Sequence, residues 1–134
     1  MSDLAIDTHA VIWYLAKSPE MSATARTAVN DAVSKGFLIL LPTISIVEIV
    51  YLIEKNRLIP QTLTSLMPFL RLPNSSFIAQ DLTPEIAQTL AQIPRLTVPD
   101  MPDRIIAATA LYLNIPLVTK DHKIQALQNI KTIW

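Results

Sequence analysis

Two short stretches of the sequence are apolar at every position, and they restrict the possible folds more than any other feature. They are Leu4-Ala5-Ile6 and Phe37-Leu38-Ile39-Leu40-Leu41. A strand that is apolar on both faces must be covered on both faces, which is typical of a parallel sheet between two layers of helices. Apolar residues make up 51% of the chain and charged residues 16%, so the side chains needed for such a core are present.

The segments between the strands have helical patterns, many of them bounded by proline or a polar cap. For example, Ile46, Ile49 and Ile53 lie on one face of an amphipathic helix. We expect helices over residues 8–16, 22–35, 46–53, 102–114 and 121–128, another starting at Thr83, and one or two short helical turns around Pro68 within residues 61–70. Further strands are expected over residues 77–79, 117–119 and 130–133. This alternation predicts an α/β fold, and the length of 134 residues predicts a single domain, residues 1–134.

The composition excludes several kinds of site. The chain has no cysteine, which excludes disulfides, thiol nucleophiles and cysteine-ligated metals. Its one glycine, Gly36, is too few for the phosphate-binding loops of Walker or dinucleotide-binding type. The net charge is zero, so no basic field indicates nucleic-acid binding. Bound cations can nevertheless supply positive charge that this count omits.

The run from Gly36 to Ile53 is apolar enough to raise the question of a membrane span. Pro42 interrupts the run, and Glu48 inside it would cost about 3 kcal/mol in lipid. A buried strand followed by a helix fits the run better. Because the start Met1-Ser2-Asp3 also lacks the basic region of a secretory signal, we expect a cytoplasmic protein with no membrane contact.

Acidic residues occur where the expected strands end and the expected helices begin. Asp7 ends the first strand, and Glu48 lies in the first turn of the helix after the second. Asp100 and Asp103 open the helix near Pro102, and Asp121 follows the strand over residues 117–119. In a doubly wound parallel sheet these acids converge on one edge. Because converging carboxylates repel, a divalent cation with oxygen ligands, Mg²⁺ or Mn²⁺, is the expected remedy, and it could activate water for phosphoryl displacement.

Each acid also has a structural interpretation. Asp100 and Asp103 fit the N-cap and third position of one helix, Asp121 fits the cap of the next, and Ser45 with Glu48 forms a capping-box pattern. The functional interpretation rests on the whole set, which follows several different strands.

Other residues near these acids are open to two interpretations. The histidines His9 and His122 either approach the site or bind phosphate, or are peripheral, which is the more common case. Trp13 and Tyr14 are expected to pack within a helix. The basic residues near the expected site fit phosphate contacts or ordinary surface charge equally well; they are Arg57, Arg104, Lys120 and Lys123.

Several stretches, taken together, resemble PIN-domain ribonucleases, specifically the VapC-like toxins of bacterial toxin–antitoxin pairs. They are Asp7–Trp13, Ile44–Ile49, Asp103–Ala110 and Leu117–Asp121, with the ending Thr132-Ile133-Trp134. The resemblance covers nearly the whole chain in the right order. It implies a PIN-like three-layer α/β/α sandwich with a central parallel sheet of about five strands.

The resemblance also implies a function, a Mg²⁺- or Mn²⁺-dependent endoribonuclease that leaves 5′-phosphate and 3′-hydroxyl ends. It implies an RNA substrate, a cognate antitoxin that inserts near the site, and a homodimer. The catalytic acids carry over to Asp7, Glu48, Asp103 and Asp121.

Among these acids, Asp7, Asp103 and Asp121 would hold metal, while Glu48 would complete the metal's shell or position the attacking water. Asp100, Thr8 and Thr119 would support them, the two threonines by orienting a carboxylate or a metal-bound water. The segment Pro99-Asp100-Met101-Pro102-Asp103 departs from the family pattern by a shifted proline, which affects Asp100 more than Asp103.

Two other functions remain open at this point. A non-catalytic PIN-like protein-interaction module would use the same fold, and the zero net charge and high apolar content favour it. A phosphatase of the haloacid dehalogenase type also places an aspartate after the first strand. That chemistry needs a second acid two residues later, where this chain has His9.

Overall fold

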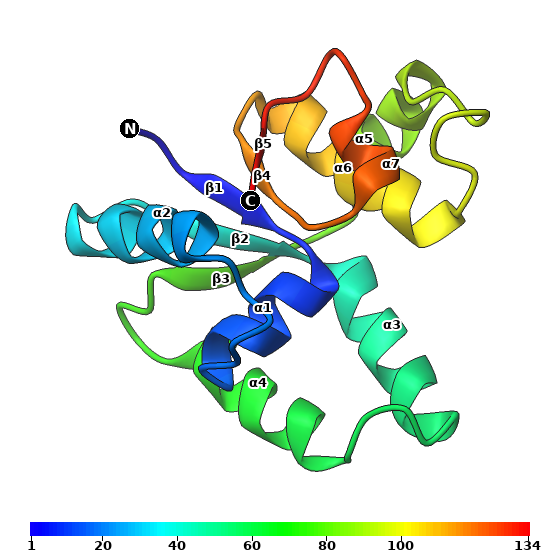
Figure 1. The fold of residues 1–134 in the computed structure, drawn as a ribbon. Helices are drawn as coiled ribbons and strands as arrows, with labels where there is room; N and C mark the ends of the chain where they lie inside the picture. The colour runs from blue at the N-terminus through cyan, green and yellow to red at the C-terminus, as the bar shows by residue number, and fades with distance from the viewer.

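A computed structural model describes all residues from Met1 to Trp134, and its centre is a parallel sheet of five strands (Figure 1). The strands are β1 (Leu4–Ile6), β2 (Ile39–Pro42), β3 (Phe77–Gln80), β4 (Leu117–Val118) and β5 (Thr132–Ile133). They lie in the order β3-β2-β1-β4-β5, and every neighbouring pair is parallel. The prediction of a central parallel sheet is therefore confirmed.

Helices cover both faces of the sheet. They are α1 (Thr8–Leu15), α2 (Ala23–Ser34), α3 (Thr43–Glu54), α4 (Gln61–Arg71), α5 (Pro84–Thr89), α6 (Met101–Leu113) and α7 (His122–Gln125), with a 3₁₀ turn at Leu90–Gln92. Strand residues alternate between the two layers. Leu4 and Ile6 pack with buried residues of α1, α2, α3 and α4, whereas Ala5 packs with those of α5, α6 and α7. This arrangement confirms the three-layer α/β/α sandwich.

The order of the strands determines where a site can form. β1 lies in the middle of the sheet, with β2 and β3 toward one edge and β4 and β5 toward the other. The carboxyl ends of β1 and β4 therefore flank a crevice at the switch point, which is where open α/β sheets bind ligands. Asp7 and Thr119 follow these two strand ends.

The prediction for residues 61–70 is wrong, because this segment is one continuous helix, α4, with Pro68 inside it. An internal proline removes a backbone hydrogen bond and costs about 3 kcal/mol. Here the helix also places Leu66 in the core and packs Leu63, Phe69 and Leu70 against it. Burial of these side chains contributes roughly 1.5–3 kcal/mol each when complete, enough to outweigh the cost of the proline.

The start of α3 also differs from the prediction. The helix begins at Thr43, so Glu48 lies in its second turn rather than its first. Ser45 does not cap the helix, and the capping-box interpretation is wrong. Ser45 is instead the third residue of the helix, and its fully buried hydroxyl lies 2.8 Å from the Thr8 hydroxyl.

The remaining differences are small shifts at the ends of elements. The second strand starts at Ile39 rather than Phe37 and includes Pro42, which pairs with Gln80. The last helix and the last strand are shorter than expected, at His122–Gln125 and Thr132–Ile133. Gly36 follows α2 with a φ of +82°, as expected for a C′ glycine. None of the helices combines the length and the apolar character that crossing a membrane requires.

Candidate active site

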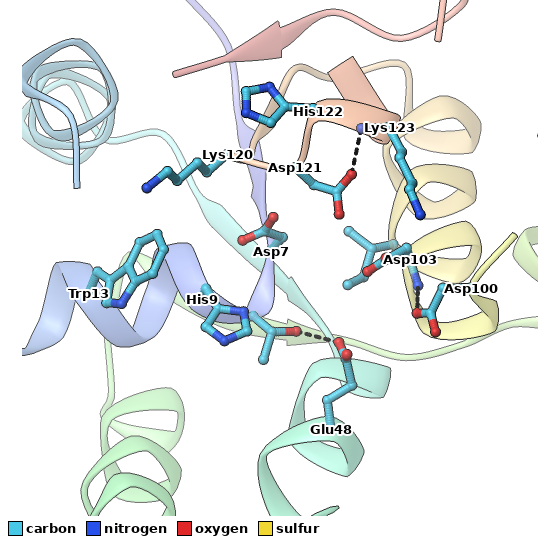
Figure 2. Close-up of a pocket in the computed structure, with 12 residues that line it drawn as sticks. Asp7, His9, Trp13, Glu48, Asp100, Asp103, Lys120, Asp121, His122 and Lys123 are labelled. Atoms are coloured by element: carbon cyan, nitrogen blue, oxygen red, sulfur yellow. Dashed lines mark hydrogen bonds between the residues drawn. The ribbon is translucent and has the colours of Figure 1, made fainter. Parts of the chain in front are cut away.

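A cleft of about 610 Å³ opens at the carboxyl ends of β1 and β4 (Figure 2). All five predicted acids line it, each reaching it from a strand end or a helix. The lining residues are Asp7, Thr8, His9, Trp13, Glu48, Asp100, Asp103, Ile106, Lys120, Asp121, His122 and Lys123. The structure thus brings together acids that are more than one hundred residues apart in the sequence, Asp7 and Asp121.

Asp7 forms the floor of the cleft and is only 9% exposed. It caps α1, since its Oδ1 accepts a hydrogen bond from the Ala10 amide at 3.0 Å. Its Oδ2 accepts a hydrogen bond from the Thr119 hydroxyl. Burial raises the pKa of Asp7, and these two hydrogen bonds partly offset that rise. The fold therefore holds both oxygens of this buried carboxylate in fixed positions.

Thr119 connects two of the acids. Its side chain is fully buried, donates to Asp7 and accepts a hydrogen bond from the Asp121 amide at 3.0 Å. Asp121 caps α7 through Oδ1 alone, which accepts from the Lys123 and Ile124 amides at 2.8 and 2.9 Å. Its second oxygen is left for the cleft (Figure 2). The structural and functional interpretations of Asp121 are thus compatible.

Glu48 reaches the cleft from α3 and is tied to α1. Thr8 Oγ1 lies 2.6 Å from Glu48 Oε1 and 2.8 Å from the buried hydroxyl of Ser45. This small cluster joins the two helices next to Asp7. Burial raises the pKa of Glu48, the Thr8 hydrogen bond lowers it, and the nearby charge of Asp100 raises it further.

Asp100 and Asp103 enter the cleft from the first turn of α6. Asp100 is the N-cap, and its Oδ2 accepts a hydrogen bond from the Asp103 amide at 3.3 Å. Asp103 is half-buried, and burial together with the charges of Asp121, Asp100, Glu48 and Asp7 raises its pKa to about 7. All four other acids act on Asp103, so it lies at the electrostatic centre of the group.

The oxygen atoms of three of these acids come close enough together to share a cation. One carboxylate oxygen from each of Glu48, Asp100 and Asp103 lies within 4.8 Å of the others. Carboxylate oxygens without histidine or cysteine suit Mg²⁺ or Mn²⁺. Asp103 is thus common to this close group and to the ligand set expected from the sequence, and Asp100, for which a supporting role is predicted, also belongs to the close group.

The residues around the acids differ from their sequence interpretations in several places. Trp13 packs against the core, as expected, but it also lines the cleft together with the two histidines. Lys120 and Lys123 line the cleft as well, whereas Arg57 does not. Arg104 donates to the carbonyls of Leu90 and Ile93 at 3.0 and 2.9 Å. The guanidinium therefore anchors α6 to the preceding turn.

Sequence reasoning missed Ser45 and Trp13 as residues of the site. Ser45 gave no signal other than its capping pattern, and that pattern predicted a helix start three residues after the observed one. Trp13 did give a signal, because it lies four residues after His9 and therefore on the same helix face.

The fold and sequence both match known proteins. A PIN domain family model matches residues 4–130. The chain is 26% identical to Ribonuclease VapC22 of Mycobacterium tuberculosis over 136 residues, which span 100% of both chains. The crystal structure of VapBC2 from Rickettsia felis, bound to a promoter DNA fragment, superposes with a TM-score of 0.71 at 19% identity and covers 97% of this chain and 96% of that one.

A toxin–antitoxin complex from Klebsiella pneumoniae superposes with a TM-score of 0.62 at 17% identity and covers 95% of this chain and 94% of that chain. These structures share the fold of this chain. Since the family model also extends over nearly its whole length, the chain belongs to the PIN domain family.

Proposed function

We propose that this protein is a Mg²⁺- or Mn²⁺-dependent endoribonuclease that acts as the toxin of a toxin–antitoxin pair. One observation carries the proposal: five carboxylates from four segments of the chain converge on one cleft, with Asp103 at their centre. A group of this kind is electrostatically unfavourable unless it takes up protons or a cation. A cation bound by these acids would offset their repulsion and would supply the chemistry of the proposed reaction.

The metal ligands are proposed from the same geometry. Asp7, Asp103 and Asp121 are the ligands expected from the sequence, and Glu48 and Asp100 bring further oxygens next to Asp103. A divalent cation held by these residues would lower the pKa of a water molecule and would stabilise the charge that develops on a phosphodiester. Thr119 orients Asp7 and Asp121 together, and Thr8 orients Glu48.

Glu48 is the proposed proton acceptor for the attacking water. Its Oε1 is held by the Thr8 hydroxyl, so Oε2 is available to receive the proton. Burial raises the pKa of Glu48, which makes its carboxylate a stronger base than an exposed one. The products would be a 5′-phosphate and a 3′-hydroxyl end.

The partners of this protein are proposed from its relatives. The sequence relative is named a ribonuclease, and one structural relative is a toxin–antitoxin complex. We accordingly assign an RNA substrate and a cognate antitoxin protein. The homodimer, the cytoplasmic location and the action of residues 1–134 as a single domain stay predictions.

The test uses a mixed pool of cellular RNA. Wild type, Asp7→Asn and Asp31→Asn are incubated with the pool in Mg²⁺, in Mn²⁺ and in chelator, and new 5′ ends are mapped by sequencing. Asp31 is an exposed acid on α2, outside the cleft, and provides the matched control. We expect metal-dependent cuts with wild type and Asp31→Asn but not with Asp7→Asn.

The opposite result would change the assignment. Identical RNA profiles for the three folded proteins, freed of any bound antitoxin, would contradict the nuclease and favour a protein-interaction module. Cuts that persist in chelator would contradict the role of the metal.

A further inference from the structure

The α1 side of the cleft carries an aromatic ring that the acid chemistry does not use. Trp13 lies on the same face of α1 as His9, and both line the cleft with the acids. In Figure 2 Trp13 and His9 lie to the left of Asp7, whereas Asp100 and Asp103 lie to its right. The ring is half-buried, so part of it is accessible from the cleft. Trp13 therefore offers an aromatic surface beside the proposed reaction centre.

The Trp13 ring is held firmly in place. Its centroid lies 5.5 Å from that of His9 and 5.8 Å from that of Trp134, both in tilted arrangements. Trp13 also packs against the buried core, and Asp7 fixes the start of the helix that carries it. A rigid ring loses little conformational entropy when a ligand stacks on it. Tryptophan of this kind is well suited to stack on a planar group.

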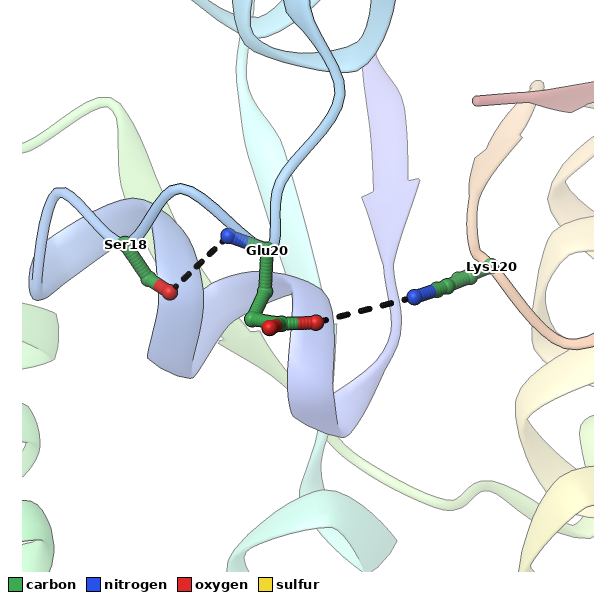
Figure 3. Close-up of polar contacts among 3 residues, drawn as sticks. All are labelled: Ser18, Glu20 and Lys120. Atoms are coloured by element: carbon green, nitrogen blue, oxygen red, sulfur yellow. Dashed lines mark hydrogen bonds and ion pairs between the residues drawn. The ribbon is translucent and has the colours of Figure 1, made fainter.

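A lysine lies over the Trp13 ring and is itself loosely held. Lys120 Nζ is 5.4 Å from the ring centroid and 3.7 Å from Glu20 Oε2 (Figure 3). Both partners of this ion pair are exposed, at 49% and 61% of their side-chain surface. Exposed pairs of this kind stabilise by about 0–1 kcal/mol. The ammonium group can therefore leave the ring when a stronger partner arrives.

The position of Glu20 is set locally. The Ser18 hydroxyl accepts a hydrogen bond from the Glu20 amide at 3.1 Å, which fixes the turn between α1 and α2 (Figure 3). Lys120 follows Thr119 directly, so its backbone is anchored beside Asp7. Its side chain extends from there to the Trp13 ring. A cation and an aromatic ring thus lie together in a cleft that five acids also line.

We propose that Trp13 forms a base-stacking subsite for a nucleotide that flanks the cleaved bond, with Lys120 moving from the ring to the neighbouring phosphate. This inference rests on the proposed ribonuclease function. Single-stranded nucleic acids bind proteins by this combination of stacked bases and backbone cations, and the stacking tolerates many base sequences. The subsite would place the strand so that its next phosphate enters the acidic part of the cleft.

The test compares two labelled oligonucleotides in Mg²⁺. One is a single-stranded RNA of twelve adenosines, and the other has the same ribose–phosphate backbone without bases. Binding is measured by fluorescence polarisation, with a gel to show that the RNA is intact; if the RNA is cut, KM is compared instead. The proteins are wild type, Trp13→Leu, Trp13→Phe, Lys120→Gln and Tyr112→Leu. Tyr112 is an exposed aromatic residue of α6 outside the cleft, so it is the matched control.

We expect wild type and Tyr112→Leu to prefer the base-bearing RNA roughly tenfold. Trp13→Leu should abolish this preference, and Trp13→Phe should keep part of it. Lys120→Gln should weaken binding of both oligonucleotides alike and reduce the salt dependence by about one phosphate contact. In the cleavage reaction Trp13→Leu should raise KM more than it lowers kcat.

Three results would overturn the subsite. One is equal binding of the two oligonucleotides by wild type, a comparison that depends on no variant. Another is an unchanged base preference in folded Trp13→Leu. If either occurs while wild type cuts the cellular RNA pool, only the subsite is wrong. Failure of wild type both to bind the RNA and to cut the pool would overturn the subsite together with the proposed function.

Discussion

Two carboxylates of the cleft, Asp7 and Asp103, are held in opposite ways. Asp7 is 9% exposed, and each of its oxygens accepts a hydrogen bond from the protein. Asp103 is half-buried, caps nothing, and lies among four other acids that together with burial raise its pKa to about 7. The protein thus supplies hydrogen bonds to the carboxylate at the floor of the cleft, whereas the carboxylates on the α6 side are left with unbalanced negative charge.

This difference separates two tasks within one site. The hydrogen bonds around Asp7 and Thr119 fix the geometry before any ligand arrives, which is the role that residues behind a metal's ligands commonly have. The crowded charge around Asp103 creates the demand for a cation. Removing a hydrogen bond at the floor should therefore damage both the fold and the function. Removing a charge on the α6 side should damage the function alone.

The largest expected effect is the loss of RNA cleavage in Asp103→Asn. Removing the carboxylate common to both groups of candidate ligands should lower the metal-dependent rate by roughly a thousandfold, because metal stabilisation of the developing charge is worth several kcal/mol. The rate is measured on the RNA cut by wild type, with Asp31→Asn as the control. A decrease of less than about tenfold would show that Asp103 is not the centre of the site.

Thr119→Val should have the next largest effect and should damage both properties. It leaves the buried Asp7 Oδ2 without its donor and the partly buried Asp121 amide without its acceptor. We expect roughly 2 kcal/mol of destabilisation and a 10- to 100-fold weaker affinity for Mn²⁺.

The control for Thr119→Val is Thr109→Val, since Thr109 is also buried but bonds only the Ile105 carbonyl within α6. Urea unfolding and calorimetry measure the two effects. Equal metal affinity in the two variants would contradict the role of Thr119.

The stability of the metal-free protein should depend on pH through Asp103. Its pKa is about 7 in the folded protein, against the ordinary aspartate value of 3.8, so the folded state binds this proton more tightly than the unfolded state. The resulting stabilisation is present below about pH 4 and is lost as the pH rises toward 7.

Asp103→Asn cannot lose a proton, so it should match wild type near pH 4 and exceed it near pH 7.5 by about 1–2 kcal/mol, a value reduced for solvent screening. Urea unfolding in chelator at both pH values measures this difference. If the gap does not widen with pH, the charge on the α6 side is not the source of instability.

Asp100→Asn should give the smallest effect. Asparagine caps helices about as well as aspartate, so the free energy of unfolding should change by less than about 0.5 kcal/mol. Mn²⁺ affinity should fall roughly threefold, as expected for the loss of one exposed charge beside the ion. Calorimetry and urea unfolding test the two parts. A collapse of stability would show that Asp100 belongs with the floor of the cleft instead.

The sequence predicts much of this fold and misses particular local features. The sequence predicts strands at Leu4–Ile6 and Ile39–Leu41 because every residue in them is apolar. The structure shows that all of these residues are buried. The helix around Pro68 is not predictable from local rules, since the packing of Leu66 in the tertiary structure outweighs the cost of the proline. The order of the strands likewise depends on contacts that no local pattern records.

The same distinction applies to the site. The acids are predictable because charges are rare in this chain and these follow strand ends. Their relative roles are not, because the proximity of Asp100 to Glu48 depends on how α6 lies against α3. Trp13 lies four residues after His9, so the sequence places the two on one face of α1, but the apolar run around them does not indicate that this face opens to the cleft.

Calorimetric titration with Mn²⁺ near pH 6 tests the central claim most directly. Wild type and Asp103→Asn are titrated in two buffers of different protonation enthalpy, so that bound metal and released protons are both counted. Because the pKa of Asp103 is about 7, wild type should bind Mn²⁺ and release close to one proton per site, whereas Asp103→Asn should bind weakly and release almost none. The absence of Mn²⁺ binding by wild type, or binding that Asp103→Asn leaves unchanged, would contradict a cation site built around Asp103.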